Sequence, residues 1–160
     1  MDLFDRYFDR LIGHEGGYVW HADDPGGETK WGISKRSYPQ LDIKGLTRER
    51  AREIYRADFW RRGELDRLPS ALSFQVFDAA VNHGIETAIR LMQRAAGVAD
   101  DGHVGPVTLS AIRSAQVTDL VARVVAERLD YWTGLSTWPT FGRGWARRAA
   151  NNLRYMAEDS

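Results

Sequence analysis

The apolar residues of this chain recur at helical spacing over most of its length, which predicts a mainly α protein. The first such segment predicts a helix from Asp2 to about Gly13, where a group of glycines ends it. Residues 18–34 break the pattern, because Gly, Pro and Asp separate short apolar pieces on either side of the turn at 24–27. We interpret this stretch as a small β-hairpin or irregular lobe.

Downstream of this lobe the helical pattern returns. The predicted helices run from Thr47 to about Trp60, Ser70 to about Asn82, Glu86 to Ala96, Pro106 to about Ser114, Thr118 to Leu135 and Gly144 to Met156. Trp138-Pro139 is expected to interrupt the helical structure between the last two helices. The pattern therefore predicts a helical bundle with a small N-terminal β-hairpin lobe that forms one side of a cleft.

Composition narrows the class of protein. The 160 residues are 43% hydrophobic and 28% charged, which is typical of a globular domain. The chain has no cysteine, so we expect neither disulfides nor thiolate metal sites. Its formal net charge of zero argues against a protein that binds nucleic acid by bulk attraction. We expect a monomer with no nucleic-acid partner.

The charges are unevenly distributed along the chain. From Met1 to Lys30 there are seven acids against three bases, whereas arginines dominate from Arg143 onward. An acidic front and a basic tail would suit an anionic polymer that is held at one place and cut at another. Solvated helix faces explain the same pattern equally well, so the interpretation stays open.

The N-terminal residues, MDLFDRYFDRLIG, carry acids among their apolar positions. They therefore resemble neither a signal peptide nor a membrane span, and no later run reaches the roughly 18 apolar residues that a span needs. We expect no stable membrane insertion, and synthesis in the cytoplasm without a signal peptide.

The candidate chemistry lies between the first helix and the predicted lobe. Glu15 follows the helix end, and Asp24, Glu28 and Thr29 follow it within fourteen positions. Inverting glycoside hydrolysis needs one carboxylic acid and a second carboxylate about 6.5–9.5 Å away that orients a water molecule. A Thr hydroxyl can hold the same water. Because acids near glycines are common in loops, this spacing is a weak signal by itself.

Longer motifs make the signal specific. Glu15-Gly16-Gly17-Tyr18, followed by DPGGETKWGIS over residues 24–34, resembles the signature of glycoside hydrolase family 108. FDAAVNHG over 77–84 is similar to the second helical motif of that family, and residues 93–98 with 101–109 resemble its C-terminal peptidoglycan-binding region. The resemblance implies a lysozyme-like α+β fold and the activity of phage endolysins and bacterial muramidases.

The resemblance also assigns catalytic roles. It implies that Glu15 is the catalytic acid, and that an Asp and Thr29 follow it in the lobe. Asp24 lies at the expected number of positions after the Glu, whereas Asp23 would restore the expected spacing in sequence between the Asp and Thr29. Glu28 is a third candidate for the second carboxylate. We favour Asp24, because the Asp-Pro pair fixes the turn from which it projects.

Aromatic residues beside these acids are candidates for sugar binding. Tyr18, Trp20 and Trp31 flank them, and aromatic faces stack on sugar rings, although aromatics more often belong to the core. We predict that they contact substrate together with Glu28 and with Asn82, which resembles the helix-end Asn of the family and could equally cap its helix. Trp132 is expected in the core, whereas Trp138, Phe141 and Trp145 fit either role.

No metal or cofactor is expected. The four histidines, His14, His21, His83 and His103, lack the H-E-x-x-H spacing of a helical zinc site. A zinc amidase is therefore disfavoured.

Together these features predict a muramidase of the endolysin type that hydrolyses the β-1,4 bond between N-acetylmuramic acid and N-acetylglucosamine. Its expected partner is the glycan strand of peptidoglycan. Residues 1–90 would form the catalytic region, and 91–160 a helical peptidoglycan-binding region packed on the same globule. Holin-type release would carry the enzyme to the periplasm and cell wall. The alternatives are a lytic transglycosylase and a non-catalytic peptidoglycan-binding or secretion-accessory protein.

Overall fold

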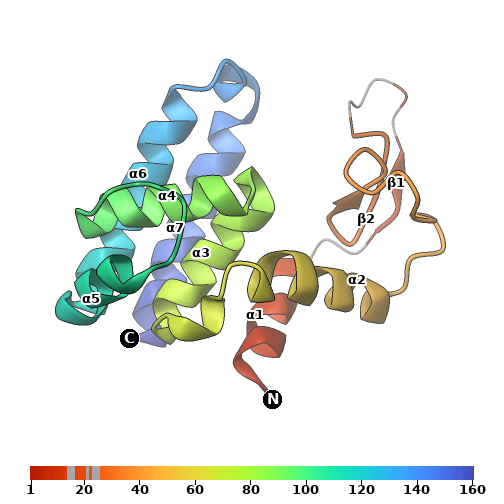
Figure 1. The fold of residues 1–160 in the computed structure, drawn as a ribbon. Helices are drawn as coiled ribbons and strands as arrows, with labels where there is room; N and C mark the ends of the chain where they lie inside the picture. Colours follow the sequence, from red (N-terminus) through yellow and green to blue (C-terminus); the bar gives the residue numbers. More distant parts are fainter. Residues whose placement is uncertain (14–16, 21, 23–25) are drawn as a thin grey trace. The chain divides into compact units, whose positions relative to one another are not determined.

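The computed structural model describes residues 1–13, 17–20, 22 and 26–160. In these residues the chain is mostly helical, with a small antiparallel sheet near its N-terminus, which confirms the predicted fold class (Figure 1). Internal contacts divide the chain into two compact units, Met1–Asp58 and Phe59–Ser160.

Helices α1 and α2 form the helical part of the first unit. They span Leu3–Ile12 and Arg48–Tyr55. The side chain of Asp2 accepts a hydrogen bond from the Asp5 amide, and that of Thr47 accepts one from the Arg50 amide, so each helix begins at a capping residue. Both starts agree with the sequence prediction.

Ion pairs connect these two helices. They join acids at positions 2, 5 and 9 to arginines spaced four residues apart, as Arg56–Asp2, Arg52–Asp5 and Arg48–Asp9. The four-residue spacing places the three arginines on one helical face. The guanidinium of Arg56 also lies 4.6 Å from the ring centre of Phe4. Part of the acidic excess near the N-terminus is therefore neutralised within the unit.

A three-stranded antiparallel sheet completes the first unit. Its strands are β1 (Val19–Trp20), β2 (Glu28–Lys30) and β3 (Ile33–Ser34), paired in that order. The predicted hairpin therefore gains a third strand, because a two-residue turn at Trp31-Gly32 folds β3 back along β2.

The second unit is a helical bundle around α3 (Ser70–His83). Its other helices are α4 (Ile85–Ala96), α5 (Pro106–Ser114), α6 (Val117–Thr133) and α7 (Trp138–Asp159). Helix α3 is buried without interruption from Ala71 to Ala80 and packs against α4, α6 and α7 (Figure 1). It is the core element of this unit.

A short irregular segment lies between α2 and α3. The predicted helix to about Trp60 is α-helical only as far as Tyr55, and then continues as a π-helix, η1, over Arg56–Arg61. A 3-10 turn, η2, follows at Leu65–Arg67.

The start of α7 corrects the prediction for the C-terminus. We expect Trp138-Pro139 to interrupt the helical structure and a helix to begin near Gly144, but α7 begins at Trp138. Proline is favoured in the first turn of a helix, where its missing N–H costs no hydrogen bond. Gly142 lies inside α7, one turn after Trp138. An added Cβ at this position would be 2.6 Å from the Trp138 ring, so the glycine permits the ring to pack closely on the helix.

A buried carboxylate joins three helices of this unit. Asp78 of α3 accepts hydrogen bonds from Arg128 of α6 at 2.8 Å and from Arg148 and Asn152 of α7 at 2.7 and 2.8 Å. Burial alone would raise the pKa of Asp78, but the two guanidinium groups outweigh it and hold that pKa well below its usual range. Asp78 is therefore charged at neutral pH.

Two features are absent from the described residues. None of their helices is both long and apolar enough to cross a membrane. No group of three or more of their His, Cys, Asp or Glu side chains is arranged to hold a metal ion.

Replacing Asp78 with Asn should destabilise the protein by about 3–5 kcal/mol, because it leaves the buried guanidinium of Arg128 and the partly buried one of Arg148 without their counter-charge. Urea unfolding followed by circular dichroism measures this loss. Asp119→Asn, at an exposed position of α6, is the matched control and should change stability by less than about 0.5 kcal/mol. Equal stability of the two variants would contradict a structural role for the buried charge.

Candidate functional site

The sequence-predicted site divides into described and undescribed residues. The predicted acid Glu15, the favoured second carboxylate Asp24 and its alternative Asp23 lie outside the described residues. The remaining predicted residues belong to both units: Tyr18, Trp20, Glu28, Thr29 and Trp31 to the first, and Asn82 to the second.

One face of the sheet brings three of the predicted residues together. Trp20 lies opposite Glu28 in the register of β1 and β2, and the Tyr18 hydroxyl donates a 2.7 Å hydrogen bond to Glu28 Oε1. This hydrogen bond raises the pKa of Tyr18. The Trp20 side chain is 60% exposed, so its ring is available to a ligand. The group combines a carboxylate, a phenol and a free indole face.

Thr29 belongs to the other face of the sheet. Its partners in the register are Val19 on β1 and Ser34 on β3. Successive side chains of a strand point to opposite faces, so Thr29 and Glu28 project in opposite directions. A ligand on one face of β2 can therefore contact either the Glu28 carboxylate or the Thr29 hydroxyl. One ligand atom cannot contact both.

Trp31 is held by the fold in an unusual backbone conformation. Its φ is +53° and that of Gly32 is +73°, which corresponds to the two central residues of a type I′ hairpin turn. The Trp31 indole N–H donates to the Leu46 carbonyl at 3.2 Å, and the Tyr55 hydroxyl donates to the Trp31 carbonyl at 2.9 Å. These two bonds fix the turn. The half-buried Trp31 ring therefore has a structural contact beside its predicted role in binding.

In the second unit, Asn82 lies beside a histidine whose protonation can be assigned. The buried Trp132 donates its indole N–H to His83 Nε2, and Asn82 Nδ2 lies 3.1 Å from the same nitrogen. An indole N–H can only donate, so His83 Nε2 must be the unprotonated nitrogen. Neutral His83 then carries its hydrogen on Nδ1.

Burial supports the neutral state of His83. It lowers the pKa of His83 to about 4, and the positive charges of Arg128 and Arg148 act in the same direction. No hydrogen-bond partner of His83 Nδ1 occurs in the described part of the chain. His83 therefore offers one unused donor at neutral pH.

Aromatic residues of α7 extend from this histidine toward solvent. We call Trp138, Phe141 and Trp145 the aromatic surface. The Trp145 ring stacks on buried Trp132 with centroids 5.7 Å apart, and Phe141 lies 5.8 Å from Trp145. Phe141 is 53% exposed, whereas Trp132 is fully buried as predicted. The surface thus rests on the core and faces solvent at its outer edge.

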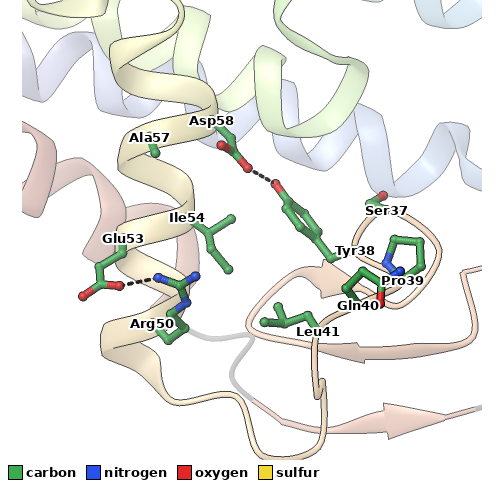
Figure 2. A pocket seen from close by; sticks show the side chains of 10 residues that line it. All are labelled: Ser37, Tyr38, Pro39, Gln40, Leu41, Arg50, Glu53, Ile54, Ala57 and Asp58. Carbon is green, nitrogen blue, oxygen red and sulfur yellow. Dashed lines mark hydrogen bonds and ion pairs between the residues drawn. The ribbon is translucent and has the colours of Figure 1, made fainter.

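A pocket of about 530 Å³ lies in the first unit between residues 37–41 and the helical segment from Arg50 to Asp58 (Figure 2). Its charged side chains are paired within the lining: Tyr38 donates to Asp58 at 2.7 Å, and Arg50 donates to Glu53 at 2.7 Å. None of the described sequence-predicted site residues lines it.

Sequence reasoning did not single out His83 or the aromatic surface as one unit. The signal was present, because Trp138, Phe141 and Trp145 are spaced i, i+3 and i+7, which is one face of a helix. A helix that begins at Gly144 separates them, and the actual start at Trp138 joins them.

Comparison with known proteins covers both parts of the chain. The family model described as Glycosyl hydrolase 108 matches residues 8–84, and one described as a predicted peptidoglycan domain matches residues 87–150. The solved structure of Brucella abortus SagA is 31% identical to the chain, covers 98% of it and 95% of SagA, and superimposes with a TM-score of 0.90. No curated protein sequence matches the chain.

The two matched regions define a glycoside hydrolase that acts on peptidoglycan. With a similar structure at this identity over nearly its whole length, the chain belongs to the glycosyl hydrolase 108 family. The first matched region contains Glu15, Asp24 and the sheet residues, as well as Asn82 and His83. The second contains the aromatic surface.

Gly32→Ala should destabilise the first unit by about 1–3 kcal/mol, because an added Cβ would lie 2.4 Å from the Tyr55 hydroxyl oxygen. Gly27→Ala is the matched control: its φ of +67° is also positive, but no atom of the described residues lies within 4 Å of the added Cβ. It should cost only the backbone strain, about 1 kcal/mol. Urea unfolding compares the two variants. A loss no larger for Gly32 would contradict the turn contact.

The neutral state of His83 predicts a pH dependence of stability. Between about pH 6.5 and pH 4 the unfolded chain binds a proton at His83 that the folded chain does not, so the free energy of unfolding should fall as pH is lowered through this range. His83→Gln keeps an acceptor for Trp132 and takes up no proton. Its fall, measured by urea unfolding across the range, should be smaller. Identical pH profiles would contradict the assignment.

Proposed function

We propose that this chain is a muramidase that hydrolyses the β-1,4 bond between N-acetylmuramic acid and N-acetylglucosamine. The observation that carries the proposal is the match to glycosyl hydrolase 108 over residues 8–84, which includes the Glu15-Gly16-Gly17-Tyr18 motif. The match to a peptidoglycan domain over 87–150 supports the same polymer as substrate.

In this mechanism Glu15 is the general acid. It protonates the oxygen of the departing sugar as the bond to the anomeric carbon breaks, and the positive charge that develops on the ring makes that carbon open to water. An acid with this role must keep its proton near neutral pH. Partial burial beside apolar side chains raises the pKa of a carboxyl group and so supplies that condition.

We propose Asp24 as the second carboxylate, with inversion of configuration. It accepts a proton from the attacking water on the opposite face of the sugar, while Thr29 positions that water. Two contacts favour Asp24 over Glu28: the Glu28 carboxylate already accepts a hydrogen bond from Tyr18, and it projects from the face of β2 opposite to Thr29. Asp23 remains the alternative that the mutants below separate.

The remaining sheet residues suit substrate binding. The exposed Trp20 ring offers a stacking surface, and the Tyr18–Glu28 pair offers a phenol and a carboxylate beside it for sugar hydroxyl groups. Because Thr29 projects from the opposite face of β2, these groups would contact a different sugar of the strand from the one that is cut. We propose residues 1–90 as the catalytic region and 91–160 as the peptidoglycan-binding region. We further propose an endolysin setting, in which holin-type release brings the enzyme to the cell wall.

Glu15→Gln should lower the rate of sacculus digestion by about 10²–10⁴-fold, because the amide cannot donate the proton. Asp24→Asn should also lose most activity, whereas Asp23→Asn is the matched control and should retain it. Dye release from labelled sacculi measures the rates, and mass spectrometry of the released muropeptides identifies the products. We expect reducing N-acetylmuramic acid ends.

Three results would contradict these assignments. Anhydro-muropeptides as the main product would indicate a lytic transglycosylase. Digestion by Glu15→Gln at the wild-type rate would overturn the role of Glu15. Loss of activity in Asp23→Asn but not in Asp24→Asn would transfer the role of second carboxylate to Asp23.

A further inference from the structure

The aromatic surface has the construction of a rigid stacking platform. Trp145 rests on buried Trp132 with an angle of 15° between the rings, and Trp138 lies 6.2 Å from Trp145. Gly142 lets the Trp138 ring lie directly on the α7 backbone. Rings that are already fixed lose little conformational freedom when a ligand stacks on them.

The buried charge network holds the base of this platform. The Arg128 guanidinium lies 4.7 Å from the Trp132 ring centre, and Arg128 in turn pairs with Asp78. Arg148 of α7 pairs with the same carboxylate. Because Trp132 also donates to His83, the position of the platform relative to the end of α3 is set by buried contacts.

Neutral polar groups lie next to the rings. The His83 ring centre is 6.3 Å from that of Trp145 and 5.0 Å from that of Tyr131. His83 Nδ1–H is a donor with no partner among the residues that the structure describes. Asn82 approaches His83 through its Nδ2, so its Oδ1 is an acceptor that no described group uses. One donor and one acceptor therefore belong to adjacent residues at the end of α3.

We propose that the aromatic surface, with His83 and Asn82, is a binding site for an N-acetylated amino sugar of a glycan strand. The apolar C–H face of the sugar ring stacks on Trp145 and Phe141. Its acetamido carbonyl accepts from His83 Nδ1–H, and a hydroxyl group of the sugar donates to Asn82 Oδ1. The choice of an amino sugar as ligand rests on the proposed function, and the site itself rests on the contacts above.

The charges of the site favour a sugar over the stem peptide of peptidoglycan. Arg148 is engaged with Asp78, and His83 is neutral at neutral pH. A peptide carboxylate would find no matching cation among these groups, whereas stacking and two neutral hydrogen bonds are what an acetamido sugar requires.

Isothermal titration calorimetry of the full chain with the tetramer of N-acetylglucosamine tests the site. Phe141→Ala and His83→Gln should each weaken binding about tenfold, equivalent to about 1.4 kcal/mol. Val107→Ala, which removes an exposed apolar side chain of α5, is the matched control and should bind like wild type. The glucose tetramer, which lacks acetamido groups, should bind at least about tenfold more weakly than the amino-sugar tetramer. Indole N–H signals of Trp138 and Trp145 should shift in NMR spectra of the wild type.

Wild-type affinity in both Phe141→Ala and His83→Gln, or unshifted Trp138 and Trp145 signals at saturation, would overturn the proposal. Equal affinity for the glucose tetramer would overturn the recognition of the acetamido group. Because binding needs no turnover, these outcomes are distinct from failure of the proposed muramidase activity, which appears only in the muropeptide products.

Discussion

The buried carboxylate of Asp78 is the interaction on which the second unit depends. It lies on the most buried helix, and its two guanidinium partners come from α6 and α7, so one side chain ties three helices together. Desolvation makes such a network expensive, and apolar replacements of similar volume are often as stable. Its contribution is therefore best understood as register: it determines which turn of α6 and which turn of α7 face α3. Trp132 and His83 take their positions from that register, and the aromatic surface takes its position from Trp132.

The first unit is held by a different kind of contact. Its charged pairs lie at the surface, where a single pair contributes little to stability. Their regular spacing nevertheless aligns α1 along α2, and the stacking of guanidinium groups on Phe4 and Phe8 adds apolar contact to each pair. The Trp31-Gly32 turn provides the second constraint, because hydrogen bonds to Leu46 and from Tyr55 fix the strand pair that carries Glu28 and Thr29. The sheet residues of the candidate site are thus positioned by backbone geometry rather than by a large core.

Apolar periodicity was sufficient to predict most helices, because a helix that buries one face in the fold has apolar residues at helical spacing in its sequence. It failed at Trp138, because a Pro that can end one helix is also favoured in the first turn of the next, and Pro139 lies in the first turn of α7. The partners of Asp78 could not be predicted, because they lie 50 and 70 positions away. For the site, local sequence placed Tyr18, Trp20 and Glu28 near one another, but only the strand register puts Thr29 on the other face. The aromatic surface on α7 could be recognised as one surface only with the helix start at Trp138 known.

The ion pairs between α1 and α2 and the buried pair at Asp78 differ in their sensitivity to the surrounding solution. Mobile ions screen charges that water reaches, and the screening length falls from about 10 Å at 0.1 M salt to about 3 Å at 1 M. The pairs of the first unit are partly exposed, whereas the Asp78–Arg128 pair is almost completely excluded from solvent. Ionic strength therefore acts on the pairing of α1, which precedes the Glu15 motif in sequence, with α2, and hardly on the buried Asp78–Arg128 pair.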